Sequence, residues 1–412
     1  MTAIPASIDR LGHAVPDHVP ADLVVPFDFH SDPEFRTDPF GCLRQLFRLP
    51  RIFYTPVHYA KPGAWVVSRD EDVRYVLQHA ELFSSTGSVS FSQLIGENWP
   101  MIPVELDPPR QTAFRMLLNP MFSPKEMGLL DSKIRETSSG LVAAFAANGE
   151  CDFISEFARP FPISIFLAIM GLPTAALVDF ADWAKGVMSS FDESVMRSSM
   201  QSMVDFLREQ IADRKVQPKD DLISKVVHAN IDGRAITDDE VIGTCFLLFI
   251  AGLDTVTSSL SFHFHFLATN PEIQQQLRDD RSRIPAAVEE LLRLFAVVSL
   301  NRRVMADTEI AGVKLKEGDW VMVSLSGASN DPSEFPDPEK FDPDRANMRH
   351  TAFALGPHRC LGSHLARREF VAALNAWFDA VPPFTLKPGE VPVGHGGVIF
   401  GYQNLSLAWA TP

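Results

Sequence analysis

One long apolar helix, predicted between Thr237 and Asn270, constrains this fold more than any other feature of the sequence. Thr237 and Glu240 form a capping-box pattern with acids in the first turn, and Pro271 ends the helix. At about 1.5 Å per residue such a helix spans about 50 Å, the width of a whole domain. Its centre, residues 241–253, is almost unbroken in apolar character but too short for a membrane span. We therefore expect a helix buried on all sides.

The rest of the chain predicts a mainly α fold with a small β-rich region. Helical patterns dominate to about residue 300, after a short strand at Trp65–Ser68 and a helix opening at Asp70. Beyond residue 300, apolar residues alternate around glycine turns, which predicts strands and hairpins, and a further strand is expected at Gly397–Phe400.

No repeat and no long linker divides the 412 residues, so a single domain is expected over 1–412. Its parts are a Pro-rich N-terminal arm (1–39), a mostly helical part (about 40–300) and a part with β hairpins (about 301–412).

Composition excludes several classes of protein. Fifty-two acidic against 37 basic residues give a net charge of −15, which argues against a nucleic-acid partner. Apolar residues at 46% exclude a disordered chain. The four cysteines form no close pair, so neither a zinc site nor a disulfide framework is expected, and a cytoplasmic location fits best. The N-terminus has no signal-peptide pattern, and no membrane association is expected.

Cys360 lies in a tight loop of glycines and a proline, directly before an amphipathic helix. A thiol at a helix N-terminus meets the positive end of the dipole and free N–H groups, and both favour the thiolate that binds metals. N–H groups near Leu361 and Gly362 would tune its electron donation. A lone cysteine is more often a buried structural residue, so the neighbouring residues must decide.

Those neighbours resemble the haem-binding signature of the cytochrome P-450 family, Phe-x-x-Gly-x-x-x-Cys-x-Gly, with Phe353, Gly356, Cys360 and Gly362 at its fixed positions. The resemblance implies the P-450 fold, with the long central helix over haem b (iron protoporphyrin IX) and Cys360 as the axial thiolate ligand of the iron. It also implies that Phe353 packs near the sulfur. Ala354 stands where many members have glycine, which should slightly stiffen the loop.

Further matches lie in order along the chain, from about residue 25 to 410, and are strongest to the bacterial camphor-type (camphor 5-monooxygenase-type) hydroxylases. Residues 328–345 resemble the irregular meander that precedes the cysteine loop, and the helix after Gly362 resembles the proximal helix. A Glu-x-x-Arg pair is by itself only a helical ion pair. In the family context Glu290, Arg293 and Arg345 are expected to form a structural ion network.

The resemblance also assigns the contacts of the haem propionates. Arg115 ends a matching stretch in which Gln111 stands where many members carry histidine. Arg302, with Arg303 as the alternative register, and His358 are expected to make the other contacts.

Asp254 and Thr255 give the central helix its polar middle, although a buried carboxylate costs several kcal/mol unless it is paired or protonated. In the family the matching acid–alcohol pair supplies protons while dioxygen is activated, and we assign that role to these two residues. The Thr255 hydroxyl can bond to the carbonyl of Ala251, while Gly252 is expected to leave a groove open beside the haem.

By position, the substrate pocket is expected to be apolar, which suits a monoterpenoid or norisoprenoid. Trp99 replaces the tyrosine of camphor-type enzymes, so camphor is a doubtful substrate, although the indole N–H could still donate to one. The expected lining residues are Trp99, Met101, Leu247, Ile250, Ala251, Val298, Val398 and Ile399.

The expected function is therefore haem-thiolate monooxygenation of a small apolar substrate with dioxygen. No flavin or iron–sulfur pattern occurs, so electrons are expected from an acidic [2Fe-2S] ferredoxin with its reductase. The alternatives are a peroxide-driven or non-hydroxylating haem-thiolate enzyme and a haem-based sensor. A local basic patch would dock the ferredoxin. Its expected members are Arg110, Arg115, Arg359, Arg367 and Arg368.

Overall fold

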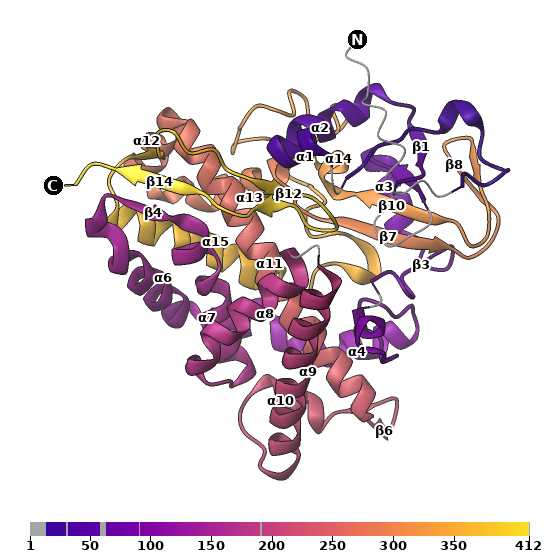
Figure 1. Cartoon of the computed structure of the whole chain (residues 1–412), viewed down its shortest axis with the longest axis horizontal. Coiled ribbons are helices and arrows are strands. Elements are labelled where there is room, and N and C mark those ends of the chain that lie inside the picture. Colours follow the sequence, from indigo (N-terminus) through magenta and orange to yellow (C-terminus); the bar gives the residue numbers. More distant parts are fainter. Residues whose placement is uncertain (1–13, 30–31, 58–62, 90, 190–191, 412) are drawn as a thin grey trace.

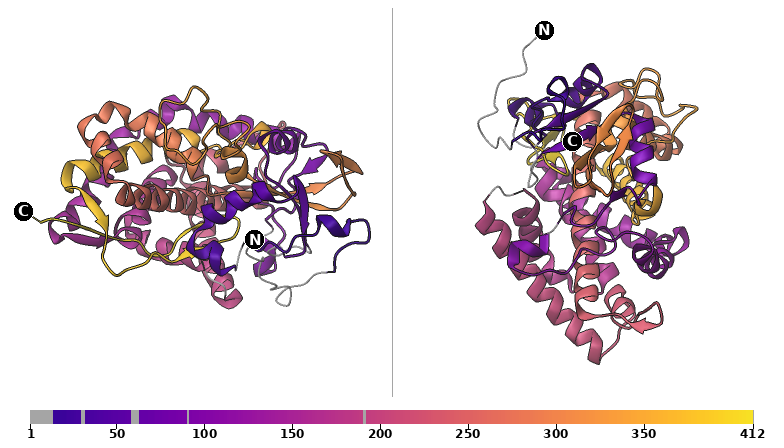
Figure 2. Two further views of the ribbon diagram at one scale, coloured as in Figure 1. Left: turned by 90° about the horizontal axis from the view of Figure 1, so that it is seen from above. Right: turned by 90° about the vertical axis from the view of Figure 1, so that its right-hand side faces the viewer.

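The computed structural model describes residues 14–29, 32–57, 63–89, 91–189 and 192–411, so the first 13 residues of the predicted arm lie outside it. The predicted central helix is α11, Asp238–Thr269. Its capping box is complete, because the Thr237 side chain accepts from the N–H of Glu240 and the Glu240 carboxylate accepts from the N–H of Thr237. Figure 2 shows α11 crossing the middle of the molecule from side to side.

The same helix is long and apolar enough to cross a membrane by length and composition, with a mean hydropathy of 1.8 in its most apolar window. However, 78% of that window is buried inside the protein. Such burial is typical of the core helix of a globular protein, as the sequence predicts.

Helices form most of the molecule (Figure 1). Before α11 come α1 (Pro33–Thr37), α2 (Pro39–Gln45), α3 (Asp70–Gln78), α4 (Arg110–Leu118), α5 (Pro124–Gly128), α6 (Asp131–Phe145), α7 (Pro160–Met170), α8 (Leu177–Ser189), α9 (Glu193–Val216) and α10 (Leu222–Val227). After it come α12 (Pro271–Asp279), α13 (Ile284–Leu294), α14 (Leu325–Ser329) and α15 (Ser363–Ala380).

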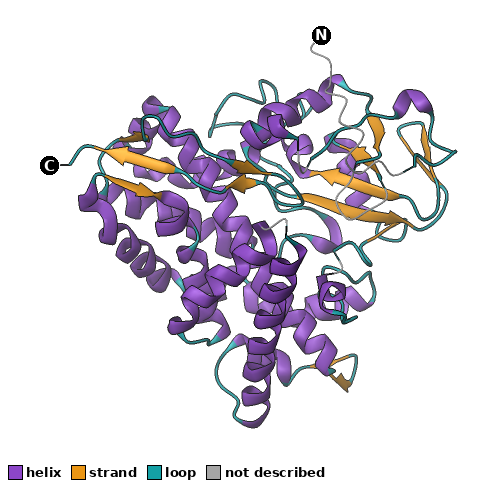
Figure 3. Cartoon of the chain, viewed as in Figure 1, coloured by secondary structure: helices purple, strands orange, loops and turns teal. Residues whose placement is uncertain are grey.

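A five-stranded sheet with the order β1-β2-β10-β7-β3 lies at the upper right of Figure 3, and other strands lie towards the left. Its strands are β1 (Ile52–Thr55), β2 (Ala64–Val67), β3 (Phe83–Ser84), β7 (Ser299–Val304) and β10 (Trp320–Ser324). Strands β2 and β10 pair in parallel, and the other neighbours pair antiparallel. The sheet therefore joins residues 52–84 to residues 299–324, which lie far apart in the sequence.

Smaller sheets complete the fold. A three-stranded sheet has the order β11-β14-β4. It consists of β4 (Glu150–Asp152), β11 (Phe384–Leu386) and β14 (Ser406–Trp409). Three hairpins pair β5 (Asn230–Ile231) with β6 (Arg234–Ala235), β8 (Thr308–Ile310) with β9 (Val313–Leu315), and β12 (Gly394–His395) with β13 (Gly401–Tyr402).

The strand predicted at Gly397–Phe400 is wrong. These residues connect β12 to β13, and only Ile399 makes an isolated bridge, to Val298. Gly397 has φ +122°, a conformation that a continuous strand does not use. The mainly α architecture with a small β-rich region is confirmed, while the assignment of the whole chain to one domain stays a prediction.

Aromatic packing holds α11 in place. Phe264 of α11 stacks on Phe153 with ring centroids 4.2 Å apart, and it meets the buried Trp377 of α15 edge-on at 5.0 Å. One turn before the helix centre, Phe249 packs edge-on against Phe166 of α7. Such pairs add about 0.5–1.5 kcal/mol each beyond the burial of their area. The helix is thereby fixed along its length by different neighbours.

Candidate functional site

One face of α11 is accessible although most of the helix is buried. Ala251 is exposed at the helix centre, and Leu247 and Thr255, four residues on either side, are half-buried. Residues spaced by four lie above one another on a helix, so these three side chains form one accessible stripe. The Thr255 hydroxyl donates to the carbonyl of Ala251 at 2.9 Å, as expected.

Gly252 does not open the expected groove. A methyl group at this position would come 3.2 Å from a ring carbon of Phe166, on α7. The glycine therefore allows α7 to pack closely against α11. The accessible stripe runs through Ala251 instead.

Asp254 lies half-buried beside this stripe. Its Oδ2 is buried and accepts no hydrogen bond from the described residues. Burial raises the pKa of the Asp254 carboxyl, and His395 and Arg159 act in the opposite direction. His395 belongs to β12, and Arg159 precedes α7. Neither was expected from the sequence, because both come from distant segments whose approach only the fold determines.

The cysteine loop is held by its own backbone. The N–H of Cys360 donates to the carbonyl of Phe353 at 2.8 Å, and Ala354 donates to Thr351 at 2.7 Å. Ala354 has φ +52°, in the left-handed region where an L-residue costs about 1–2 kcal/mol. The expectation of a slightly stiffened loop is therefore incomplete, because the alanine here is strained.

Gly356 is fixed by close contact with a neighbouring helix. Its φ is +65°, and a Cβ there would lie 2.3 Å from the carbonyl oxygen of Leu77, on α3. At Gly362, by contrast, no described residue other than its chain neighbours has a heavy atom within 4 Å of where a Cβ would stand. It is the N-cap of α15, two residues after Cys360.

Cys360 is exposed, whereas Cys42, Cys151 and Cys245 are buried. Desolvation raises the pKa of the Cys360 thiol, whereas a hydrogen bond from the backbone of Gly362 and the nearby Arg115 guanidinium lower it. Thiolate in this loop therefore depends on the donor at the start of α15 and on local positive charge.

Three basic side chains, Arg302, His358 and Arg115, lie beside the cysteine loop, and the carboxylate of Asp107 acts on the first two. Arg302 is 3% exposed, and its guanidinium donates to the carbonyl of its neighbour Asn301. Burial lowers the pKa of Arg302 to about 10, and burial and Arg302 together lower that of His358 to about 4. Arg115 donates to the carbonyl of Arg359 at 2.8 Å, and burial lowers its pKa.

The guanidinium groups of the buried Arg302 and the half-buried Arg115, with the neutral imidazole of His358 beside them, fit the carboxylates of a haem. A bound anion would compensate the cost of burying Arg302, for which no ion pair is found in the described part of the chain. The register places Arg302 inward in β7, while Arg303 is exposed. Gln111, in the place of the family's histidine, donates to the carbonyl of Pro357 at 2.6 Å and so ties α4 to the cysteine loop.

The expected ion network is brought together in full. Arg293 donates to both carboxylate oxygens of Glu290 at 2.7 and 2.8 Å, and Arg345 donates to the same carboxylate at 3.0 Å. Arg293 and Glu290 are completely buried. Arg293 also donates to the carbonyls of Ser329 and Pro338, which anchors the meander to α13.

The expected pocket residues differ in exposure. Ile250, Trp99 and Met101 are buried, whereas Val298 and Ile399 are half-buried and Val398 is exposed. The indole N–H of Trp99 donates to the carboxylate of Glu97 and is therefore already engaged in this structure. Arg208 in turn donates to both oxygens of Glu97.

Three arginines of the expected basic patch are paired with carboxylates. Arg367 pairs with Glu289 at 2.6 Å, Arg368 pairs with Asp131 at 2.6 Å, and Arg110 pairs with Glu240 at 2.9 Å. These partners neutralise the three arginines. Arg359 remains exposed, with no ion pair found among the described residues.

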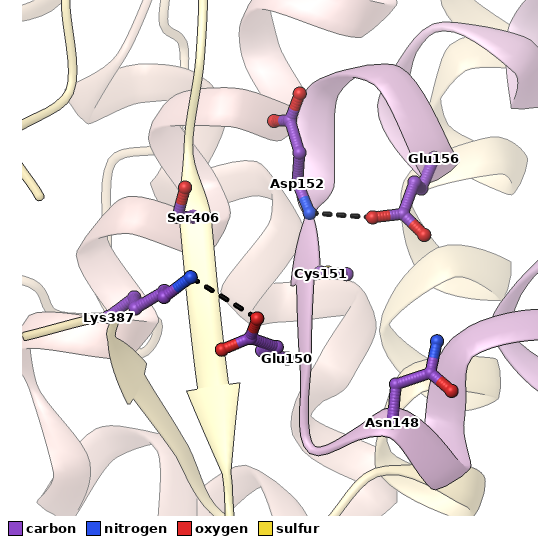
Figure 4. A pocket seen from close by; sticks show the side chains of 7 residues that line it. All are labelled: Asn148, Glu150, Cys151, Asp152, Glu156, Lys387 and Ser406. Atoms are coloured by element: carbon purple, nitrogen blue, oxygen red, sulfur yellow. Dashed lines mark hydrogen bonds and ion pairs between the residues drawn. The ribbon is translucent and has the colours of Figure 1, made fainter.

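A separate hollow of about 360 Å³ lies between β4, the π-helical turn that follows it and β14 (Figure 4). Acidic side chains and Lys387 line it, and Lys387 pairs with Glu150 at 3.2 Å. None of the haem-site or pocket residues described above belongs to this hollow.

Comparisons with known proteins agree with the geometry. The model of the family described as cytochrome P450 matches residues 163–379. Probable cytochrome P450 127A1 of Sinorhizobium fredii is 39% identical over 403 residues, covering 96% of this chain and 97% of that protein. Vitamin D3 dihydroxylase of Streptomyces griseolus is 31% identical over 379 residues, covering 89% and 92%.

Two crystal structures share the fold over almost the whole chain. Cytochrome P450 CYP101C1 has a TM-score of 0.88 at 31% identity, covering 96% of this chain and 100% of that one. CYP101J2 has a TM-score of 0.87 at 31% identity, covering 96% and 99%.

Proposed function

The chain belongs to the cytochrome P450 family and is a haem-thiolate monooxygenase, and on this premise we propose that it hydroxylates a monoterpenoid or norisoprenoid. The haem supplies the activation of dioxygen, by which one oxygen atom enters a C–H bond of the substrate. The cytoplasm is proposed as the location, since the four cysteines are free.

Cys360 is proposed as the thiolate ligand. Arg302, Arg115 and His358 would hold the propionates, which is supported by the burial of Arg302, for which no ion pair is found among the described residues. Phe353, Gly356 and Gly362 shape the loop around the sulfur. Because Ala251 is exposed and has a small side chain, the flat haem could approach α11 at this position.

Asp254 and Thr255 are proposed to deliver protons. The buried, unbonded Oδ2 of Asp254 can take a proton and turn to release it, because no hydrogen bond to a described residue holds it. Thr255 Oγ1 lies on the accessible stripe and keeps its lone pairs free while its own proton is donated to Ala251. The alcohol can thus accept a hydrogen bond from a group at the haem.

The observation that supports the substrate class is the orientation of Trp99. Its single donor is engaged by Glu97, so the indole offers the pocket only hydrocarbon surface. Met101, Leu247 and Ile250 are likewise apolar. Side chains that offer no free donor favour substrates that need no hydrogen bond for orientation.

An optical titration of the ferric protein with camphor, ionones and other terpenoids tests this proposal. A near-complete low- to high-spin conversion with an ionone-like compound and a weak one with camphor is the expected result. No conversion with any member of the panel would contradict the substrate class.

An acidic [2Fe-2S] ferredoxin with its reductase is proposed as the electron donor. Arg359 is exposed, and the apolar Met116 of α4 and Leu129, directly after α5, are each 73% exposed. Arg359→Glu is expected to slow reduction by ferredoxin at low salt, because charge reversal acts on the rate of association. Unchanged kinetics would exclude this surface.

A further inference from the structure

Three side chains connect helix α9 to the expected substrate pocket. Arg208 of α9 donates from Nη1 and Nη2 to the two oxygens of Glu97, at 2.9 and 2.7 Å. The same carboxylate accepts the indole N–H of Trp99. Trp99 is 3% exposed and meets Phe246 of α11 with ring centroids 5.1 Å apart. A surface ion pair is thus joined to a buried ring.

The backbone beside Trp99 is fixed to α11. The N–H of Ile102 donates to the carbonyl of Gly243 at 3.3 Å, and a Cβ on Gly243 would lie only 2.1 Å from the carbonyl oxygen of Pro100. These contacts fix the backbone next to Trp99 but not its indole ring. The orientation of the ring depends on side-chain contacts, and the polar contact among them is the hydrogen bond to Glu97.

In the hydrogen bond between Trp99 and Glu97 the roles of donor and acceptor cannot be exchanged. The hydrogen bonds from Arg208 hold the pKa of Glu97 below its ordinary value, so it is a carboxylate at neutral pH and can only accept. An indole N–H can only donate. The bidentate Arg208 fork fixes the plane of the carboxylate, and the carboxylate fixes the indole.

We infer that Glu97 and Arg208 are positioning residues that determine substrate specificity by holding Trp99 as an apolar wall with its N–H turned away from the substrate. The inference rests on the proposed function only in taking Trp99 as a wall of the pocket. The side chains of Glu97 and Arg208 are 25% and 45% exposed, so the pair lies at the surface.

The test compares the binding of imidazole and 4-phenylimidazole to the haem-loaded protein by optical titration. In Arg208→Gln and Glu97→Ala the indole loses its fixed orientation, and a larger ligand must order it on binding. The affinity for 4-phenylimidazole relative to imidazole is expected to fall about threefold or more. Arg197→Gln is the matched control, since Arg197 also lies on α9 and pairs with Glu193 at 2.6 Å on the surface.

A double mutant separates positioning from general destabilisation. In a Trp99→Phe background, which has no indole N–H, Arg208→Gln is expected to have no further effect on the affinity ratio. If Arg208→Gln disturbs haem retention, Arg208→Lys keeps the charge without the fork, and the same fall in the ratio is expected.

Two results would overturn the inference. One is an affinity ratio in Arg208→Gln and Glu97→Ala equal to that of Arg197→Gln. The other is an equal effect of Arg208→Gln with and without the Trp99 indole. Failure of the terpenoid titration together with a changed azole ratio would refute the proposed substrate class and leave the positioning role standing.

Discussion

The hydroxyl of Thr255 donates to the carbonyl oxygen of Ala251, four residues earlier in α11, at a distance of 2.9 Å. This bond fixes the rotamer of the threonine and assigns its proton, so that the oxygen presents lone pairs toward the accessible face. Ala251 is exposed at that face although the helix around it is buried. The relationship gives the alcohol one orientation before any ligand arrives.

Thr255→Val removes the hydroxyl and preserves the size of the side chain. If Thr255 helps to deliver protons, product formed per electron pair consumed should fall by about tenfold or more, with the remaining electrons ending in peroxide or water. The measurement is product yield against electron-donor consumption. Thr269→Val is the control, because Thr269 makes the same bond, to His265 at 2.9 Å, at the far end of α11.

Ala354→Gly relieves the left-handed backbone of the cysteine loop. The strain of φ +52° costs about 1–2 kcal/mol, and the freer unfolded glycine chain offsets about 0.4–1 kcal/mol of it, so a net gain of about 0.5–1 kcal/mol is expected. Urea unfolding of the haem-loaded protein measures the change. Ala311→Gly, at φ +49° in the β8–β9 hairpin, should give a similar gain without altering the haem spectrum.

Gly356 and Gly362 are expected to respond differently to alanine. At Gly356 the new methyl would lie 2.3 Å from a backbone oxygen of α3 and would require a left-handed alanine, so the loop should be displaced and haem binding lost. At Gly362 the new methyl would meet no described residue beyond its chain neighbours within 4 Å, so the apoprotein should fold normally. Haem content and circular dichroism of both variants test this, and normal haem binding by Gly356→Ala would contradict it.

The sequence predicted correctly those elements that are determined by interactions between residues close together in the chain. The start of α11 follows from Thr237 and Glu240, which bond to each other within one turn. The strand predicted at residues 397–400 fails for the opposite reason, because an apolar run around glycines is equally compatible with a tight connection. Only the pairing of β12 with β13 decides between them.

Site residues that belong to a sequence motif could be predicted from the sequence. Contacts between segments far apart in the chain could not. Nothing near Asp254 in the sequence indicates that His395 and Arg159 lie beside it. The partners of Arg367 and Trp99 are likewise set by tertiary packing. Glu97, two residues before Trp99, is the one local signal that could have suggested an engaged indole.

Glu369 gives the stability of the protein an unusual dependence on pH. It is 2% exposed, and burial raises its pKa from 4.5 to about 8. Between these values the folded state retains a proton that the unfolded state has lost, so stability should fall as pH rises, by at most about 1.4 kcal/mol per pH unit. Glu369→Gln is neutral throughout and should therefore stabilise the protein relative to wild type more at pH 8 than at pH 5, as measured by urea unfolding of the haem-loaded chain.

Glu290→Gln is the contrasting variant: it weakens a buried pair with Arg293 and should destabilise at both pH values. A constant difference between Glu369→Gln and wild type from pH 5 to pH 8 would show that Glu369 is not protonated in the folded protein.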